Sequence, residues 1–138
     1  MSRRTLGADE QGAAAVEFAI LLPLLLLLLF GLVDFGRLFF VQIGLNSASI
    51  EGARASALGR SAADVTAIAR ASAPNVPQMT GVPGAQVGVS QNPCPRPGNG
   101  AATDVTVSAP FTWITPIAFF PGAEDRTVTS TSRLVCYG

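Results

Sequence analysis

The sequence predicts an α+β protein with one long N-terminal helix, a short second helix and a small antiparallel sheet. Three observations lead to this prediction. An apolar tract lies near the N-terminus, no proline occurs between Pro23 and Pro74, and the C-terminal half holds short runs rich in Val, Thr and Ser. Uninterrupted helix-compatible residues favour one long helix, whereas alternating β-branched residues favour strands. The length of 138 residues allows one small domain beside that helix.

The composition excludes several kinds of chemistry. Nine basic residues balance nine acidic ones, every basic residue is an arginine, and histidine is absent. Such a chain has no histidine base or metal ligand and no Schiff-base lysine. It also lacks paired carboxylates at a useful spacing, so we expect no enzyme, no metal and no cofactor. Apart from Arg3 and Arg4 the arginines are scattered singly, and we expect no nucleic-acid partner.

Residues 13–33 form the first predicted element, a membrane span. The stretch from Phe18 to Val33 carries no charge, and extending it back to Ala13 adds only Glu17. At about 1.5 Å per residue these residues cover about 31 Å, close to the thickness of a bilayer core. A buried core helix is the alternative, but so short a chain has little else with which to cover a leucine tract.

A cleaved signal peptide is a second interpretation of the same segment. Its cleavage site would follow the apolar run, but the stretch from Leu32 to Gly36 is a poor site. We therefore expect the span to stay in the mature protein. Arg3 and Arg4 precede it and favour an N-terminus on the cytoplasmic side, which leaves the C-terminal region outside.

We expect the helix to continue beyond the bilayer, from Ala13 to Leu58, with its second half protruding. Gly59 is a plausible C-terminal stop. Pro23 removes one backbone hydrogen bond, so a bend or local melting is expected there. Two acid–arginine pairs stand three residues apart and can interact along the helix: Asp34 with Arg37, and Glu51 with Arg54.

The protruding half carries a stripe of small residues, each four positions apart: Gly44, Ala48, Gly52 and Ser56. This spacing places all four on one helical face, and small side chains allow another element to approach closely. That element is either this chain's own C-terminal domain or the helix of a neighbouring copy, and the sequence favours neither.

The C-terminal elements follow in order. Ser61 and Asp64 have the spacing of a capping box that opens a second helix, and Pro74 ends it. Residues 86–90, 104–109 and 127–137 read as strands. Between the last two strands lies an apolar patch that we interpret first as core, with a membrane interface or a partner as the alternative: Phe111, Trp113, Ile114, Ile117, Phe119 and Phe120.

The two cysteines, Cys94 and Cys136, both lie beyond the span. An even pair outside the cytoplasm, without histidine, favours a disulfide in an oxidising compartment. Two buried free thiols are the alternative, and two ligands are too few for a metal site.

The boundary before the span carries a further motif. Glu17 is the fifth residue after Gly12 and stands at the edge of the apolar tract. A carboxylate in lipid is costly, so it needs a partner. Cleavage after Gly12 would create an amine at Ala13 that supplies one, on the same chain or on a neighbour. The alternative is a carboxylate that reaches the headgroups. We expect the outer domain to lie about 60 Å from Glu17 along the helix.

This pattern resembles a type IV prepilin, with a polar leader ending in glycine, a glutamate at the fifth mature position and a long apolar helix. Three segments resemble the TadE-like family of pseudopilins or minor pilins of the tight-adherence (Flp) pilus: GAAAVEFAILLPL from Gly12, FGLVDFGR from Phe30, and ASIEGAR from Ala48. The resemblance covers about residues 11–58, and it implies a type IV pilin-like fold.

The resemblance also implies a processing route and partners. A prepilin peptidase would cleave between Gly12 and Ala13, so that residues 1–12 are a leader, 13–58 the long helix and 59–138 an extracytoplasmic domain. The protein would wait in the inner membrane and then join the pilus at the cell surface, with other pilins as partners and Glu17 as an assembly contact. The competing hypothesis is a single-span, membrane-anchored extracytoplasmic binding module that keeps its leader and does not polymerise.

Overall fold

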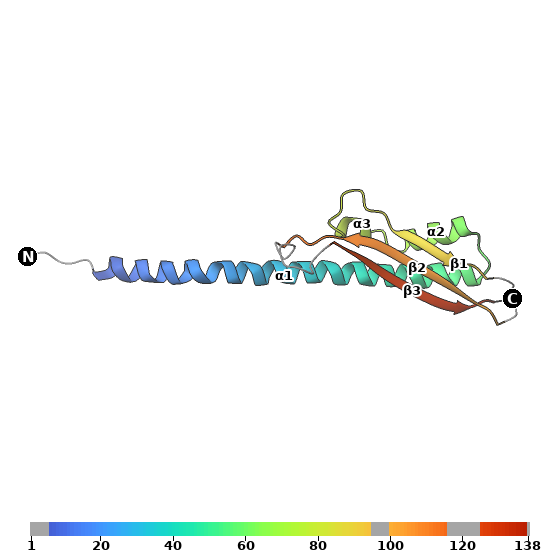
Figure 1. The fold of residues 1–138 in the computed structure, drawn as a ribbon, viewed down its shortest axis with the longest axis horizontal. Helices are drawn as coiled ribbons and strands as arrows, with labels where there is room; N and C mark the ends of the chain where they lie inside the picture. Colours follow the sequence, from blue (N-terminus) through green and yellow to red (C-terminus); the bar gives the residue numbers. More distant parts are fainter. Residues whose placement is uncertain (1–5, 95–99, 116–124, 138) are drawn as a thin grey trace, which may run out of the picture.

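The computed structural model describes residues 6–94, 100–115 and 125–137. It contains the helices α1 (Leu6–Ala57), α2 (Ala62–Ala71) and α3 (Val76–Met79), and the strands β1 (Gly88–Asn92), β2 (Ala102–Phe111) and β3 (Arg126–Val135). The strands form one antiparallel sheet in the order β1-β2-β3. The sheet and the short helices lie along the C-terminal half of α1, and the N-terminal half extends alone (Figure 1). The predicted α+β architecture is confirmed.

The long helix starts earlier than predicted. It begins at Leu6 rather than Ala13, because a helix already nucleated extends cheaply into neighbouring helix-compatible residues. It remains helical through Pro23, so the predicted local melting does not occur. Its C-terminus is closed by Gly59, which has a φ of +74° that glycine adopts without strain. The Arg60 N–H donates to the Ala55 carbonyl at 3.1 Å, as in a Schellman ending.

The exposure of α1 changes abruptly along its length. Among the described residues it is the one helix long and apolar enough to cross a membrane, and nothing in the structure covers that apolar part. Asp34 is the first fully buried position on α1, and from there one face packs under the domain, with Val41 and Leu45 in the core. The helix is therefore an uncovered apolar rod at one end and a core element at the other.

The sheet is covered on one face only. Alternate residues of β2, from Thr103 to Phe111, are buried toward α1, and the positions between them are partly exposed. On the open face the hydroxyls of Thr106 and Thr131 are 2.8 Å apart. Apolar and polar residues thus alternate as expected for a sheet with one solvated face.

The shorter elements agree with the predictions in kind but not in every bound. The Ser61 hydroxyl accepts from the Asp64 N–H at 3.2 Å and donates to its carboxylate at 2.8 Å, so the predicted cap opens α2. β1 starts and ends two residues later than predicted because it pairs with β2 from Gly88 to Asn92. α3 was not predicted.

Candidate functional site

The predicted processing and assembly residues lie on the uncovered half of α1. Gly12, Ala13 and Glu17 are all exposed, and the helix runs through the Gly12–Ala13 bond without a break. The expected distance of about 60 Å between Glu17 and the domain is wrong. The domain packs back along the helix as far as Asp34, which is about 26 Å from Glu17 at the helical rise.

The stripe of small residues lies under the protein's own domain. Ala48 is fully buried and Ser56 nearly so. A Cβ added at Gly44 would collide with Val76 of α3, and one added at Gly52 would lie 3.0 Å from a methyl group of Val105. Of the two partners considered for this stripe, the structure shows the intramolecular one.

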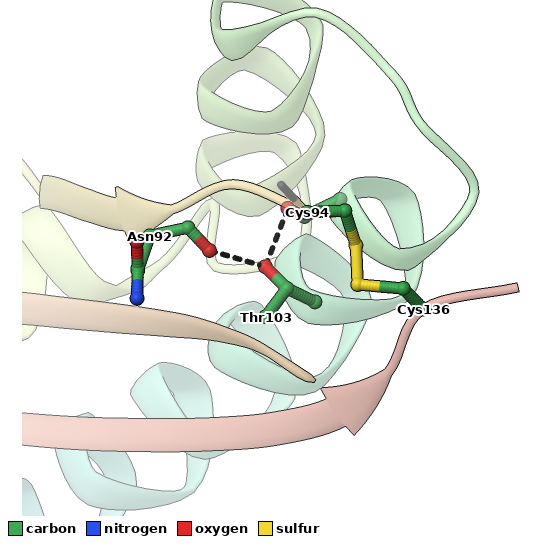
Figure 2. The surroundings of a disulfide bond; sticks show 5 residues. Asn92, Cys94, Thr103 and Cys136 are labelled. Carbon is green, nitrogen blue, oxygen red and sulfur yellow. Dashed lines mark hydrogen bonds between the residues drawn. A yellow bond between two sulfur atoms is a disulfide. The ribbon is translucent and has the colours of Figure 1, made fainter. Parts of the chain in front are cut away.

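Hydroxyl groups join α1 to the sheet beside this stripe. The Ser49 hydroxyl lies 2.8 Å from that of Ser132 and 3.2 Å from that of Ser130. The Ser56 and Thr103 hydroxyls are 2.6 Å apart, and Thr103 donates to the backbone carbonyl of Asn92 at 2.7 Å (Figure 2). These contacts were not predicted from the sequence. Each hydroxyl has a partner, which keeps the cost of burying it low.

Cys94 and Cys136 form a disulfide, with their Cα atoms 5.9 Å apart (Figure 2). It connects the chain just beyond β1 to the residue that follows β3. The Cys136 N–H also donates to the Ala101 carbonyl at 2.8 Å. The bond therefore closes the end of the sheet that lies farthest from the free half of α1.

The opposite end of the domain is held by Asp34. Its buried carboxylate accepts from the N–H groups of Ile114 at 3.1 Å and Thr115 at 2.7 Å, and from the Thr115 hydroxyl. The same carboxylate pairs with Arg37 at 2.8 Å, as the sequence predicted. The contact with the segment after β2 was not predicted, because its partners are 80 residues away in the chain.

Arg37 extends this junction to two further elements. It donates to the Met79 carbonyl at 3.0 Å, and its guanidinium carbon lies 5.1 Å from the centre of the Phe111 ring. Burial raises the pKa of Asp34, but hydrogen bonds from Thr115, Ile114 and Arg37 lower it more, so this pKa lies below its ordinary value of 3.8. Asp34 follows the predicted span of residues 13–33 and lies outside it.

The predicted apolar patch divides into core and surface. Phe111 is fully buried, and Trp113 packs edge-on against it with ring centres 5.3 Å apart. Trp113 also contacts Phe35 of α1 at 6.2 Å, whereas the Ile114 side chain is 63% exposed. The other predicted members, Ile117, Phe119 and Phe120, lie outside the described residues. Within the described residues no group of acidic or cysteine side chains could hold a metal ion.

Together these features define a pilin-like class of protein: an apolar helix suited to single-pass membrane anchoring, whose second half is the spine of a small α+β domain. The family model described as TadE-like protein matches residues 12–54, which confirms the resemblance to that family along the long helix. Over these residues the chain is therefore similar to pilin-like proteins associated with the tight-adherence pilus. No curated protein and no solved structure matches the chain.

Proposed function

We propose that this protein is a minor pilin or pseudopilin that is needed to assemble or initiate a tight-adherence pilus. One observation carries the proposal. The helix that matches the TadE-like model from residue 12 has an uncovered apolar half, which begins at the Gly12–Ala13 bond and carries a single acidic residue, Glu17, before Asp34. A prepilin peptidase acts at that bond, releasing residues 1–12 and leaving residues 13–58 as the helix of the mature subunit.

Assembly then depends on helix packing rather than on catalysis. In the inner membrane residues 13–33 span the bilayer, and residues 59–138 lie outside the cytoplasm. Ala13 and Glu17 are four residues apart, about one helical turn, so the new amine and the carboxylate are neighbours on one face. In the pilus Glu17 pairs with the Ala13 amine of its own or an adjacent subunit. Low dielectric strengthens such a pair, and the pair sets the register between helices of neighbouring pilins.

The substitution Glu17→Ala tests this role. Glu17 lies about 26 Å along the helix from the first buried residue, so the outer domain should fold normally. Removing a charge should ease residence in the bilayer, because a carboxylate in hydrocarbon is unfavourable. We expect normal abundance, a normal N-terminus and loss of co-purification with sheared pili.

The matched control is Glu51→Ala, which removes an exposed carboxylate from the same helix. The 3.2 Å ion pair between Glu51 and Arg54 is also exposed. We expect this variant to stay with the pili. Recovery of Glu17→Ala in the pilus fraction at the wild-type level would show that Glu17 is not an assembly contact.

A further inference from the structure

We propose that the outer domain rests on the lipid headgroup region through an apolar face formed by Phe35, Trp113 and Ile114, called here the interfacial face. The inference rests on the single-span anchoring in the proposed function and adds a contact that positions the domain. Phe35 and Ile114 are each 63% exposed, and Trp113 is half-buried between Phe35 and Phe111.

The interfacial face lies at the depth of the headgroups. Phe35 is about 3 Å beyond Val33, the last residue of the span, along the helix axis. The Asp34 carboxylate accepts the Ile114 N–H at 3.1 Å, which fixes the segment after β2 at the same height. The polar layer on each side of a bilayer core is roughly 5–8 Å thick. Figure 1 shows that β2 ends on the side of the sheet that faces the free half of α1.

On α1 the charge near this face is neutralised within the protein. Asp34 and Arg37 are the only charged residues on α1 between Glu17 and Glu51. They pair with each other, and their side chains are 0% and 13% exposed. Approach to lipid therefore desolvates no free charge on this part of the helix, and it removes the exposed Phe35 and Ile114 side chains from water.

Continuity with the span favours lipid as the occupant. The interfacial face begins two residues after the predicted membrane segment, so headgroups are the surroundings that an anchored monomer brings to it. Tryptophan and tyrosine side chains are enriched at this depth because their rings tolerate both apolar chains and water, and Trp113 is the tryptophan of this face. A second copy of the chain, the other conceivable occupant, would have to meet this face from within the same lipid layer.

Trp113 is the single tryptophan of the chain and reports directly on this contact. The full-length protein is reconstituted into phosphatidylcholine vesicles that carry bromine either near the headgroup or near the chain ends. We expect strong quenching of Trp113 by the shallow bromine, weak quenching by the deep bromine, and little quenching by aqueous iodide. Quenching by iodide without quenching by shallow bromine would overturn the inference, as would cross-linking of copies through this face without lipid quenching.

Two variants show that the quenching comes from the interfacial face. Ile114→Arg places a charge at an exposed position, and Ile114 contacts Asp34 through its backbone N–H alone. This variant should lose most of the shallow-bromine quenching. Ile50→Arg is the matched control, because Ile50 is also exposed on the protein but lies about 26 Å beyond the span; it should match the wild type. Equal quenching in the two variants would contradict the inference.

Flotation of the same vesicles separates the two proposals. Protein that floats but gives no shallow-bromine quenching retains the anchor and overturns only the interfacial face. Protein that does not float overturns both the anchored pilin and the contact that depends on it.

Discussion

Asp34 connects the two halves of the molecule through one carboxylate. Its oxygens accept hydrogen bonds from Arg37 on the same helix and from the backbone of Ile114 and Thr115 after β2. All of these donors need a partner, because a buried donor without an acceptor costs about 1–3 kcal/mol. At the end of the domain nearest the apolar half of α1, these hydrogen bonds and the ion pair therefore add to the packing of Phe111 and Trp113.

The substitution Asp34→Asn should destabilise the domain by about 3 kcal/mol, because it leaves the nearly buried Arg37 without its counter-charge and weakens the hydrogen bonds to the loop. Thermal unfolding in detergent, followed by circular dichroism, measures the loss. Glu51→Gln is the control, since it breaks an exposed pair of the same spacing and should change stability by less than about 1 kcal/mol. Equal losses of stability in the two variants would show that the buried Asp34–Arg37 pair stabilises the domain no more than the exposed pair does.

The pH dependence of the stability difference between the wild type and Asp34→Asn is an additional readout. The folded pKa of Asp34 is lowered, so its contribution is fully present above the unfolded pKa of about 3.9 and is lost as the pH falls through the folded value. The stability difference between wild type and Asp34→Asn should thus be constant near neutral pH and shrink below about pH 4. A difference that grows on acidification would contradict this assignment.

Among the elements, the C-terminal half of α1 has little room for added side-chain atoms where other elements pack closely against it. Gly44→Ala should destabilise the domain by about 1–3 kcal/mol, because the new methyl group collides with Val76 and α3 must shift. Gly36→Ala on the same helix meets no atom within 4 Å. It should be neutral or stabilising by up to about 1 kcal/mol through helix propensity. Thermal unfolding of both variants in the same detergent provides the comparison, and a destabilisation by Gly36→Ala as large as that by Gly44→Ala would refute the packing argument.

Local sequence patterns predicted the elements that depend on residues close together in the chain. The apolar tract and the lack of proline predicted α1, and the Ser61–Asp64 spacing predicted the cap of α2. Alternation predicted β2, and a high content of Thr, Ser and Val predicted β3. The bounds of β1 were wrong by two residues because its register depends on pairing with β2. The contacts of Asp34 were missed for a similar reason, since they join residues far apart in the chain.

At the scale of the whole molecule, the domain is fastened at both ends. Asp34 holds the end nearest the span, and the disulfide between Cys94 and Cys136 holds the far end. The cysteine pair could be predicted because only two cysteines exist, both beyond the apolar tract. The packing of the small-residue stripe could not be decided from the sequence, because one helical face serves equally well for an internal or an external partner.

Removal of the disulfide should cost about 4 kcal/mol in the chain-entropy model, because the bond joins residues 42 positions apart. Thermal unfolding with and without reductant measures this cost. The double variant Cys94→Ser, Cys136→Ser should unfold at the lower temperature whether or not reductant is present. A wild-type transition that reductant does not move would show that the bond adds no stability.

The proposed processing to a pilin subunit is tested by the N-terminus of the mature protein. Mass spectrometry of protein from cells that contain the prepilin peptidase should find a chain beginning at Ala13. The variant Gly12→Leu should keep residues 1–12 and be heavier by that leader, because a bulky side chain replaces the glycine at the cleavage site. Wild-type protein that still begins at Met1 or Ser2 in those cells would contradict the proposed cleavage and, with it, the pilin function.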